Sequence, residues 1–169
     1  MKHWQRIAFG IFTIVGSTVG FISGVSGLFS GSNLIEWLML IAATVVYAWG
    51  IWCGIGLLQA EVGAERANLK FWLVQVPSFG SPLISYFLSC GFHTTVSLQL
   101  FPIKLSAKIL VGSYFSYGLL QPNQPFIIGI NLFAMFIVWW LSKSVVQLSP
   151  NFAVNKDAPT ATLPGRPLP

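Results

Sequence analysis

Acidic residues are scarce in this sequence. Only four Asp or Glu residues occur among 169 residues, against nine Lys or Arg, and charged residues make up 8% of the chain. A soluble domain typically carries about 25% charged residues, so this chain cannot cover a water-facing surface of its size. Because 54% of its residues are hydrophobic, we interpret residues 1–148 as one integral membrane domain.

Paired metal ligands and paired cysteines are also lacking. The chain has two histidines, His3 and His93, and two cysteines, Cys53 and Cys90. The topology derived below places the members of each pair far apart, whereas a disulfide needs Cα atoms within about 7 Å and a metal site needs more ligands than two distant histidines. We therefore expect no disulfide, no metal site, no haem and no other cofactor.

Catalytic signatures are missing as well. General acid–base catalysis needs at least two positioned titratable groups, and none of the few charged residues stands beside a plausible nucleophile in a recognisable motif. The sequence therefore predicts no catalytic residue and a protein that is not an enzyme. The basic residues are scattered rather than clustered on one face, which argues against nucleic acid as a partner.

What the sequence does contain is long uncharged runs. Residues 7–29 and 34–59 are each long enough to cross a hydrocarbon core of about 30 Å. Two further spans are predicted at 64–79 and 125–147, which makes the expected fold an all-α integral membrane protein with four transmembrane helices. The first run also fits a signal peptide, but it exceeds the usual apolar length of about 7–15 residues and no A-x-A-like site follows it. A retained helix is favoured.

Residues 85–118 alternate in polarity instead of following a helical period. Period-two alternation is typical of a half-buried strand, and Phe101-Pro102 can turn the chain between two such runs. We predict a small extracytoplasmic β-hairpin over about 84–118, between the third and fourth helices. The alternative is a third helix that continues to residue 92, followed by a loop. The polar positions of the predicted strands are Ser85, Ser89, His93, Thr95, Ser97, Gln99, Lys104, Ser106, Lys108 and Ser116.

The basic residues predict the orientation, because Lys and Arg are enriched in cytoplasmic loops. Four crossings with the N-terminus inside place seven basic residues in the cytoplasm and only Lys104 and Lys108 outside. Both termini are then cytoplasmic, and the hairpin is periplasmic if the membrane is a bacterial inner membrane. Residues 149–169 are rich in proline and poor in hydrophobic residues, which predicts a disordered cytoplasmic tail. The predicted cytoplasmic set is Lys2, Arg6, Arg66, Lys70, Lys143, Lys156 and Arg166.

Small and polar residues within the spans are candidates for helix packing. Small residues four apart allow close approach of helices in lipid. This face either dimerises or packs inside the monomer, and with four helices available we favour the second. Glu36 complements a helix start, while Gln75 and Asn131, at different estimated depths, are expected to hydrogen-bond separately to neighbouring helices. The glycines with this spacing are Gly16, Gly20, Gly24, Gly50 and Gly54.

The predicted hairpin is the one element that would present an apolar face together with polar groups outside the membrane. We therefore expect a non-catalytic membrane protein that binds a protein or lipid partner through this hairpin, beyond its contact with the bilayer itself. A homo-oligomer is also compatible with the sequence. The alternative function is a small oligomeric transporter or channel, although few intramembrane charges and no inverted repeat support it.

Overall fold

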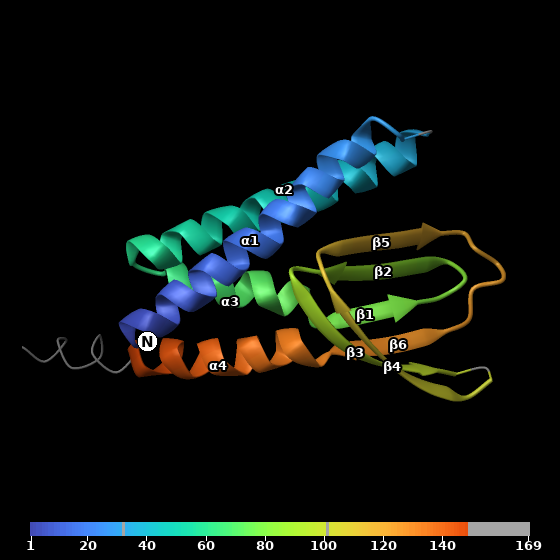
Figure 1. The fold of residues 1–169 in the computed structure, drawn as a ribbon. Coiled ribbons are helices and arrows are strands. Elements are labelled where there is room, and N and C mark those ends of the chain that lie inside the picture. Colours follow the sequence, from blue (N-terminus) through green and yellow to red (C-terminus); the bar gives the residue numbers. More distant parts are fainter. Residues whose placement is uncertain (32, 101, 149–169) are drawn as a thin grey trace, which may run out of the picture.

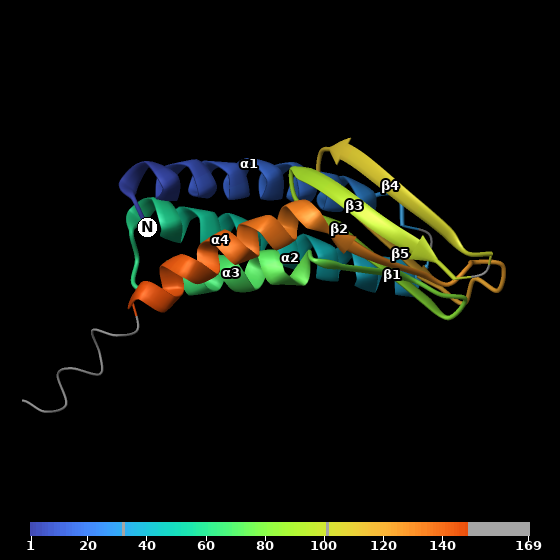
Figure 2. The ribbon, with the colours of Figure 1, turned by 90° about the horizontal axis from the view of Figure 1, so that it is seen from below.

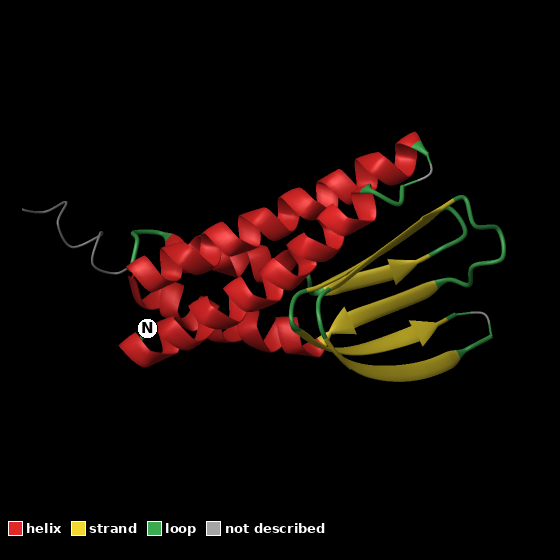
Figure 3. Cartoon of the chain, turned by 45° about the horizontal axis from the view of Figure 1, so that its top comes forward, coloured by secondary structure: helices red, strands yellow, loops and turns green. Residues whose placement is uncertain are grey.

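The computed structural model describes residues 1–31, 33–100 and 102–148 as four helices and six strands (Figure 1). The helices occupy one half of the long molecule and the sheet the other half, with the tip of the first helix pair running beside the sheet (Figure 3). The elements, in chain order, are α1 (His3–Leu28), α2 (Leu34–Gln59), α3 (Ala64–Val74), β1 (Pro77–Gly80), β2 (Ile84–Ser89), β3 (Phe92–Gln99), β4 (Lys104–Val111), β5 (Tyr114–Leu119), β6 (Ile127–Asn131) and α4 (Leu132–Leu148).

Helix boundaries follow from local capping chemistry. Asn33 accepts a hydrogen bond from the backbone N–H of Glu36 at 2.9 Å, which begins α2 as an N-cap. Ala60 adopts a left-handed conformation after α2, and Gly63 does the same before α3, so the chain reverses in a short turn. Pro77, which has no backbone N–H, lies just beyond the end of α3 and begins a strand instead.

The six strands form one antiparallel sheet in the order β4-β3-β6-β1-β2-β5. Residues 84–119 contribute a long hairpin whose two arms keep one register. The pairing runs from Ile84 opposite Leu119 to Ser89 opposite Tyr114, and it resumes at Phe92 opposite Val111. The hairpin is therefore continuous. Its near half, β2–β5, is at the open end of the hairpin, and its far half, β3–β4, carries the turn. These two halves lie at opposite ends of the sheet.

Two bends fold this hairpin over. One arm bends at Cys90-Gly91 and the other at Gly112-Ser113, where the two glycines have φ of +78° and +129°. The backbone N–H of Gly112 donates to the carbonyl of Gly91 at 2.6 Å, so the bends are locked together. Strands β1 and β6 then pair with each other and connect the two halves, and the sheet is strongly curved (Figures 1 and 2).

The core lies where the helices meet the base of the sheet. Tyr47, Phe71 and Trp72 are fully buried there, and the Tyr47 hydroxyl donates to the Ser89 carbonyl at 2.9 Å. The indole N–H of Trp72 donates to the Thr13 hydroxyl at 3.2 Å, which connects α3 to α1. Helical packing and sheet position are thus set by the same buried side chains.

The predicted all-α fold with four transmembrane helices is wrong. Strands make up about a quarter of the described residues, and among the described helices only α1 and α2 are long and apolar enough to cross a membrane by length and composition. Helix α3 stops at Val74, short of the predicted 79 and of the alternative end at 92. Residues 127–131 of the predicted fourth span form strand β6. The predicted disordered tail lies outside the described residues.

Candidate functional site: a polar cavity inside the folded sheet

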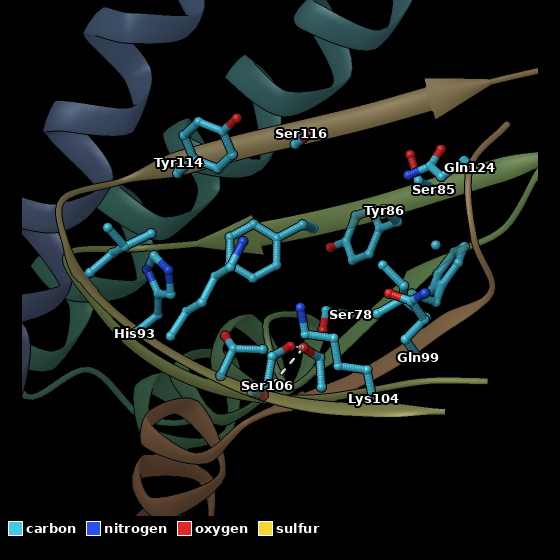
Figure 4. A pocket seen from close by; sticks show the side chains of 18 residues that line it. Ser78, Ser85, Tyr86, His93, Gln99, Lys104, Ser106, Tyr114, Ser116 and Gln124 are labelled. Carbon is cyan, nitrogen blue, oxygen red and sulfur yellow. Dashed lines mark hydrogen bonds between the residues drawn. The ribbon is translucent and has the colours of Figure 1, made fainter. Parts of the chain in front are cut away.

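The concave side of the curved sheet encloses a cavity of about 470 Å³. Side chains from β4 and β5 face one another across it, and β1 and β6 contribute its back (Figure 4). The cavity therefore exists because the hairpin is folded over. Its lining residues are Ser78, Phe79, Gly80, Ser85, Tyr86, Phe87, His93, Thr95, Ser97, Gln99, Lys104, Ser106, Lys108, Leu110, Tyr114, Ser116, Gln124 and Ile127.

The far half of the hairpin supplies most of the polar lining. Alternate side chains of a strand point to the same face, and in β3 and β4 that face is polar. Three cross-strand pairs meet on this wall: Gln99 with Lys104, Ser97 with Ser106, and Thr95 with Lys108. The hydroxyl groups of Ser97 and Ser106 lie 2.9 Å apart in a hydrogen bond. The alternate polar positions predicted from the sequence in these two strands are the positions that line the cavity.

Two glycines make room for lining side chains on the strands paired with them. A Cβ atom on Gly129 of β6 would lie 3.1 Å from Ser97 Cβ and 3.3 Å from Thr95 Cγ2. A Cβ atom on Gly118 of β5 would collide with the Ser85 hydroxyl and approach Gln121 within 3.1 Å. These two positions therefore admit no side chain without displacing their neighbours.

The deepest polar groups of the cavity lack hydrogen-bond partners. His93 is 2% exposed and Thr95 is 8% exposed. Within the described residues, neither His93 Nδ1 nor Thr95 Oγ1 has a hydrogen-bond partner. Buried polar atoms are normally satisfied, and an orphaned one calls for an explanation such as a ligand or water.

The charge of the cavity is positive. Lys104 and Lys108 line it from β4, and none of the described lining residues is acidic. Three of the four acidic residues of the chain are described, and each lies on or beside a helix: Glu36 in the first turn of α2, Glu61 just after α2, and Glu65 in α3. Glu65 pairs with the N-terminal ammonium group at 3.6 Å.

The opposite, convex face of the sheet is apolar and exposed. Leu105 and Val111 of β4 are 71% and 82% exposed, although Lys104 and Ser106, on either side of Leu105, line the cavity. The sheet is thus polar inside and apolar outside, the reverse of a sheet that packs over a hydrophobic core. The exposed apolar residues of this outer face are Ile84, Leu98, Leu105, Ile109, Val111, Ile128 and Ile130.

The two bends of the hairpin dock on the middle of α1. The Ser113 hydroxyl donates to the Gly16 carbonyl, and a Cβ atom on Gly16 would lie 2.7 Å from Cys90 Sγ and 2.9 Å from the backbone nitrogen of Gly91. Gly16 lies at the midpoint of α1. The His93 end of the cavity is therefore level with the centre of α1, and the Lys104 end lies farther toward the α1–α2 turn.

The other predicted packing glycines lie between helices of the same chain. A Cβ atom on Gly20 would strike the ring of Tyr47, and one on Gly24 would strike the Thr44 hydroxyl, both on α2. From α2, Gly50 faces Ser17 and Phe71, and Gly54 faces Ile14 and the Gly10 carbonyl. Gly16 differs from the other glycines because it contacts the bends of the hairpin rather than another helix.

The predicted intramembrane polar residues do not form one site. The Gln75 amide N–H donates to the Phe71 carbonyl at 3.3 Å within its own segment. Asn131 Oδ1 accepts from the backbone N–H of Ala134 at 3.3 Å, and it therefore caps α4. The Asn131 backbone nitrogen also donates to the Val76 carbonyl at 2.9 Å, so Gln75 and Asn131 belong to one junction despite their different estimated depths. Glu36 lies far along the chain at the start of α2.

The cysteines are separate and buried. Cys53 and Cys90 are both free thiols. Cys90 Sγ lies 3.3 Å from the Ser17 hydroxyl and is packed into the base of the sheet. Both cysteines therefore act as packed side chains of the core.

Sequence reasoning missed the cavity itself. It placed His93 on a wet outer face, whereas the structure buries His93 inside the folded hairpin. Ser78 and Ile127 carried no period-two signal because β1 is short and β6 is largely apolar, and Gln124 lies in the loop before β6. Comparisons of this chain with protein-family models, with curated proteins and with solved structures gave no match.

Proposed function

We propose that this protein is a non-catalytic, membrane-anchored binding protein that takes a ligand into the cavity of its curved sheet. Helices α1 and α2 cross the bilayer, and the sheet lies along their outer halves. The observation that carries this proposal is the reversed polarity of the sheet, whose exposed outer side chains are apolar while most of the residues that line its cavity carry polar groups. An exposed apolar face of this extent marks an interaction surface, and it continues beside two apolar helices.

The lengths of the elements support this placement. Helix α3 has 11 residues and rises about 16 Å, about half of a hydrocarbon core of about 30 Å. Strand β1 continues in the same direction, and β6 followed by α4 returns (Figure 1). The chain would then pass through the membrane four times, twice as a helix and twice as a helix joined to a strand. Both described ends, residue 1 and residue 148, lie at the helical end of the molecule.

The binding function is supported by polar atoms in the cavity lining that have no hydrogen-bond partner among the described residues. A cavity of this volume falls within the range of small-molecule sites, and His93 and Thr95 offer buried polar atoms without partners. A small oligomeric transporter or channel, the alternative from the sequence, gains no specific support from the described residues.

Spin labels on neighbouring residues of β4 test the placement of the sheet. Single cysteines at Leu105 and Ser106 are labelled with a nitroxide in lipid nanodiscs, and collision rates are measured with oxygen, which concentrates in lipid, and with a water-soluble nickel complex. We expect oxygen to dominate at Leu105 and the nickel complex at Ser106, because the two side chains point to opposite faces. Ile41 on α2 and Val62 on the α2–α3 turn serve as the lipid and water references.

A high nickel collision rate at Leu105, matching that at Val62, would show that the outer face contacts water and would overturn the membrane placement. Release of the protein by carbonate extraction, or mature chains that begin near residue 29, would instead favour the signal-peptide interpretation of α1. Cys53 and Cys90 stay in place in these variants, because both are buried and the unlabelled parent measures their background.

A further inference from the structure

We propose that the ligand of this cavity carries an oxyanion, of the phosphate or carboxylate type, joined to a polar hydroxyl-bearing group. This inference rests on the proposed binding function and names the chemistry of its ligand. The oxyanion would lie against β4, between Lys104 and Lys108, and the polar group would extend toward His93.

The first support is the unbalanced positive charge. Lys104 and Lys108 are four residues apart on one strand, which separates their Cα atoms by about 13 Å, and both side chains face the cavity with Ser106 between them. Each lysine brings three donors and no acceptor. The chain has few acidic residues, and those that are described lie on or beside the helices. A bound anion supplies the missing counter-charge.

The second support is an array of hydrogen-bonding groups suited to hydroxyls and oxyanion oxygens. Short hydroxyl side chains enter the cavity from five different strands, and buried His93 and Thr95 hold unpartnered polar atoms at its inner end. Gln124 adds a further unpartnered oxygen, Oε1, which can accept a hydrogen bond from a ligand hydroxyl. The hydroxyl groups belong to Ser78, Ser85, Thr95, Ser97, Ser106 and Ser116.

The third support is position. The inner end of the cavity is level with the midpoint of α1, where the bends dock. Strand β4 has eight residues and spans about 26 Å, so its Lys104 end reaches about the depth of the outer headgroups of a bilayer. Two sources of the same chemistry are available there: a phospholipid headgroup that enters from the membrane, and a soluble phosphate ester that enters from water.

Protection of a cavity cysteine tests the inference. Ser116→Cys lies on the wall opposite Lys104 (Figure 4), and its modification by a small uncharged thiol reagent is timed in phosphatidylcholine nanodiscs. Four probes are compared: phosphatidylglycerol or extra phosphatidylcholine in the disc, and glycerol phosphate or glycerol in solution. We expect an anionic probe to slow modification while its uncharged or zwitterionic partner does not. Protection by the lipid alone identifies a headgroup site, and protection by glycerol phosphate identifies a water-accessible one.

The lysines provide the second readout. In the Lys104→Gln/Lys108→Gln variant we expect the Kd of the protective anionic probe to rise by about tenfold or more, because two charge-assisted contacts are lost. Lys70→Gln removes a lysine that does not line the cavity, and its Kd should equal that of the parent. Unchanged circular dichroism and thermal unfolding of the double variant show that the sheet has folded.

The outcomes separate the two proposals. If glycerol or phosphatidylcholine protects as well as its anionic partner, and the lysine variant binds equally, the oxyanion inference fails while the binding function stands. If anionic protection survives in the lysine variant unchanged, the assignment of Lys104 and Lys108 is wrong. If none of the four probes slows modification, the oxyanion inference is overturned, and so is ligand binding in this cavity for the chemistry tested.

Discussion

Tyr47 is the residue that joins the helices to the sheet. Its ring lies against Gly20 of α1, and its hydroxyl donates to the Ser89 carbonyl at the end of β2. A side chain at Gly20 must displace this ring and therefore the hydrogen bond to the sheet. We expect Gly20→Ala to lower the free energy of unfolding by about 1–3 kcal/mol, the usual effect of overpacking, as measured by thermal or denaturant unfolding in mild detergent.

Gly27→Ala is the matched control for this prediction. Its Cβ atom would meet only the flexible end of the Leu40 side chain, at 3.1 Å. Both substitutions gain about 1 kcal/mol of helix propensity, so their difference isolates the clash with Tyr47. Equal stability of the two variants would mean that the Tyr47 ring can move without cost.

At the scale of residues, the sequence predicted correctly which side chains share one face of a strand. It did not predict what that face contacts. The alternation correctly grouped His93, Thr95 and Ser97 on one side of a strand. It did not reveal that this side is enclosed, because enclosure depends on the pairing of β1 and β6. The roles of Gly16 and Tyr47 at the sheet boundary were equally hidden, since each is a contact between elements distant in the chain.

The bends of the folded hairpin depend on glycine at the scale of elements. Gly112 has φ of +129°, a region that is strained for any side chain, and no atom lies within 4 Å of a Cβ placed there. Gly112→Ala should therefore destabilise through the backbone alone, by about 1–3 kcal/mol. Thermal unfolding, followed by the loss of β-sheet signal in circular dichroism, measures this effect.

Val111→Ala is the neighbouring control, because Val111 is 82% exposed and has ordinary strand geometry. We expect its stability to stay within about 0.5 kcal/mol of the parent. A Gly112→Ala protein as stable as Val111→Ala would show that the bend tolerates a side chain, and that its angle is set elsewhere.

Strands could be predicted from the sequence only where polar and apolar residues alternate. Residues 85–100 and 103–118 alternate, and they do pair as antiparallel strands, although each run is divided by a bend into two strands. Residues 127–131 read as an apolar run that continues into α4, and a short apolar run does not distinguish a strand from a buried helix. Pro77–Gly80 forms strand β1, although residues 77–79 were predicted to be the end of the third span.

At the scale of the whole molecule, the arrangement of the elements predicts a membrane topology that reporter fusions can check. We expect fusions after Ser30 and Leu120 to report from outside, and fusions after Val62 and Leu148 to report from the cytoplasm. The reason is that the charged residues around the α2–α3 turn and the N-terminus lie at one end, while the loops after α1 and β5 lie toward the other (Figure 1). A fusion after Leu148 that reports from outside would exclude an even number of passes.

Counting apolar runs predicted four helical spans, and two of those runs are not helical throughout. A helix that crosses alone needs about 20 apolar residues, and α3 has 11 while α4 has 17. Composition shows that a segment is apolar enough for lipid, but it does not show that the segment is helical throughout. Here each short helix is extended by a central strand, whose backbone is paired on both sides.

The strand order has a consequence for biosynthesis. Among the described strands, β6 is the last to be translated, yet it lies near the middle of the sheet and joins β3 to β1. Until residues 127–131 leave the ribosome, the β3–β4 arm has no neighbour on its inner edge, and the two halves are linked only through their bends. A stalled or truncated chain therefore keeps an unpaired strand edge, the kind of exposed edge that promotes aggregation. Addition of β6 is the step that joins the β3–β4 pair to the three strands β1, β2 and β5 in one sheet.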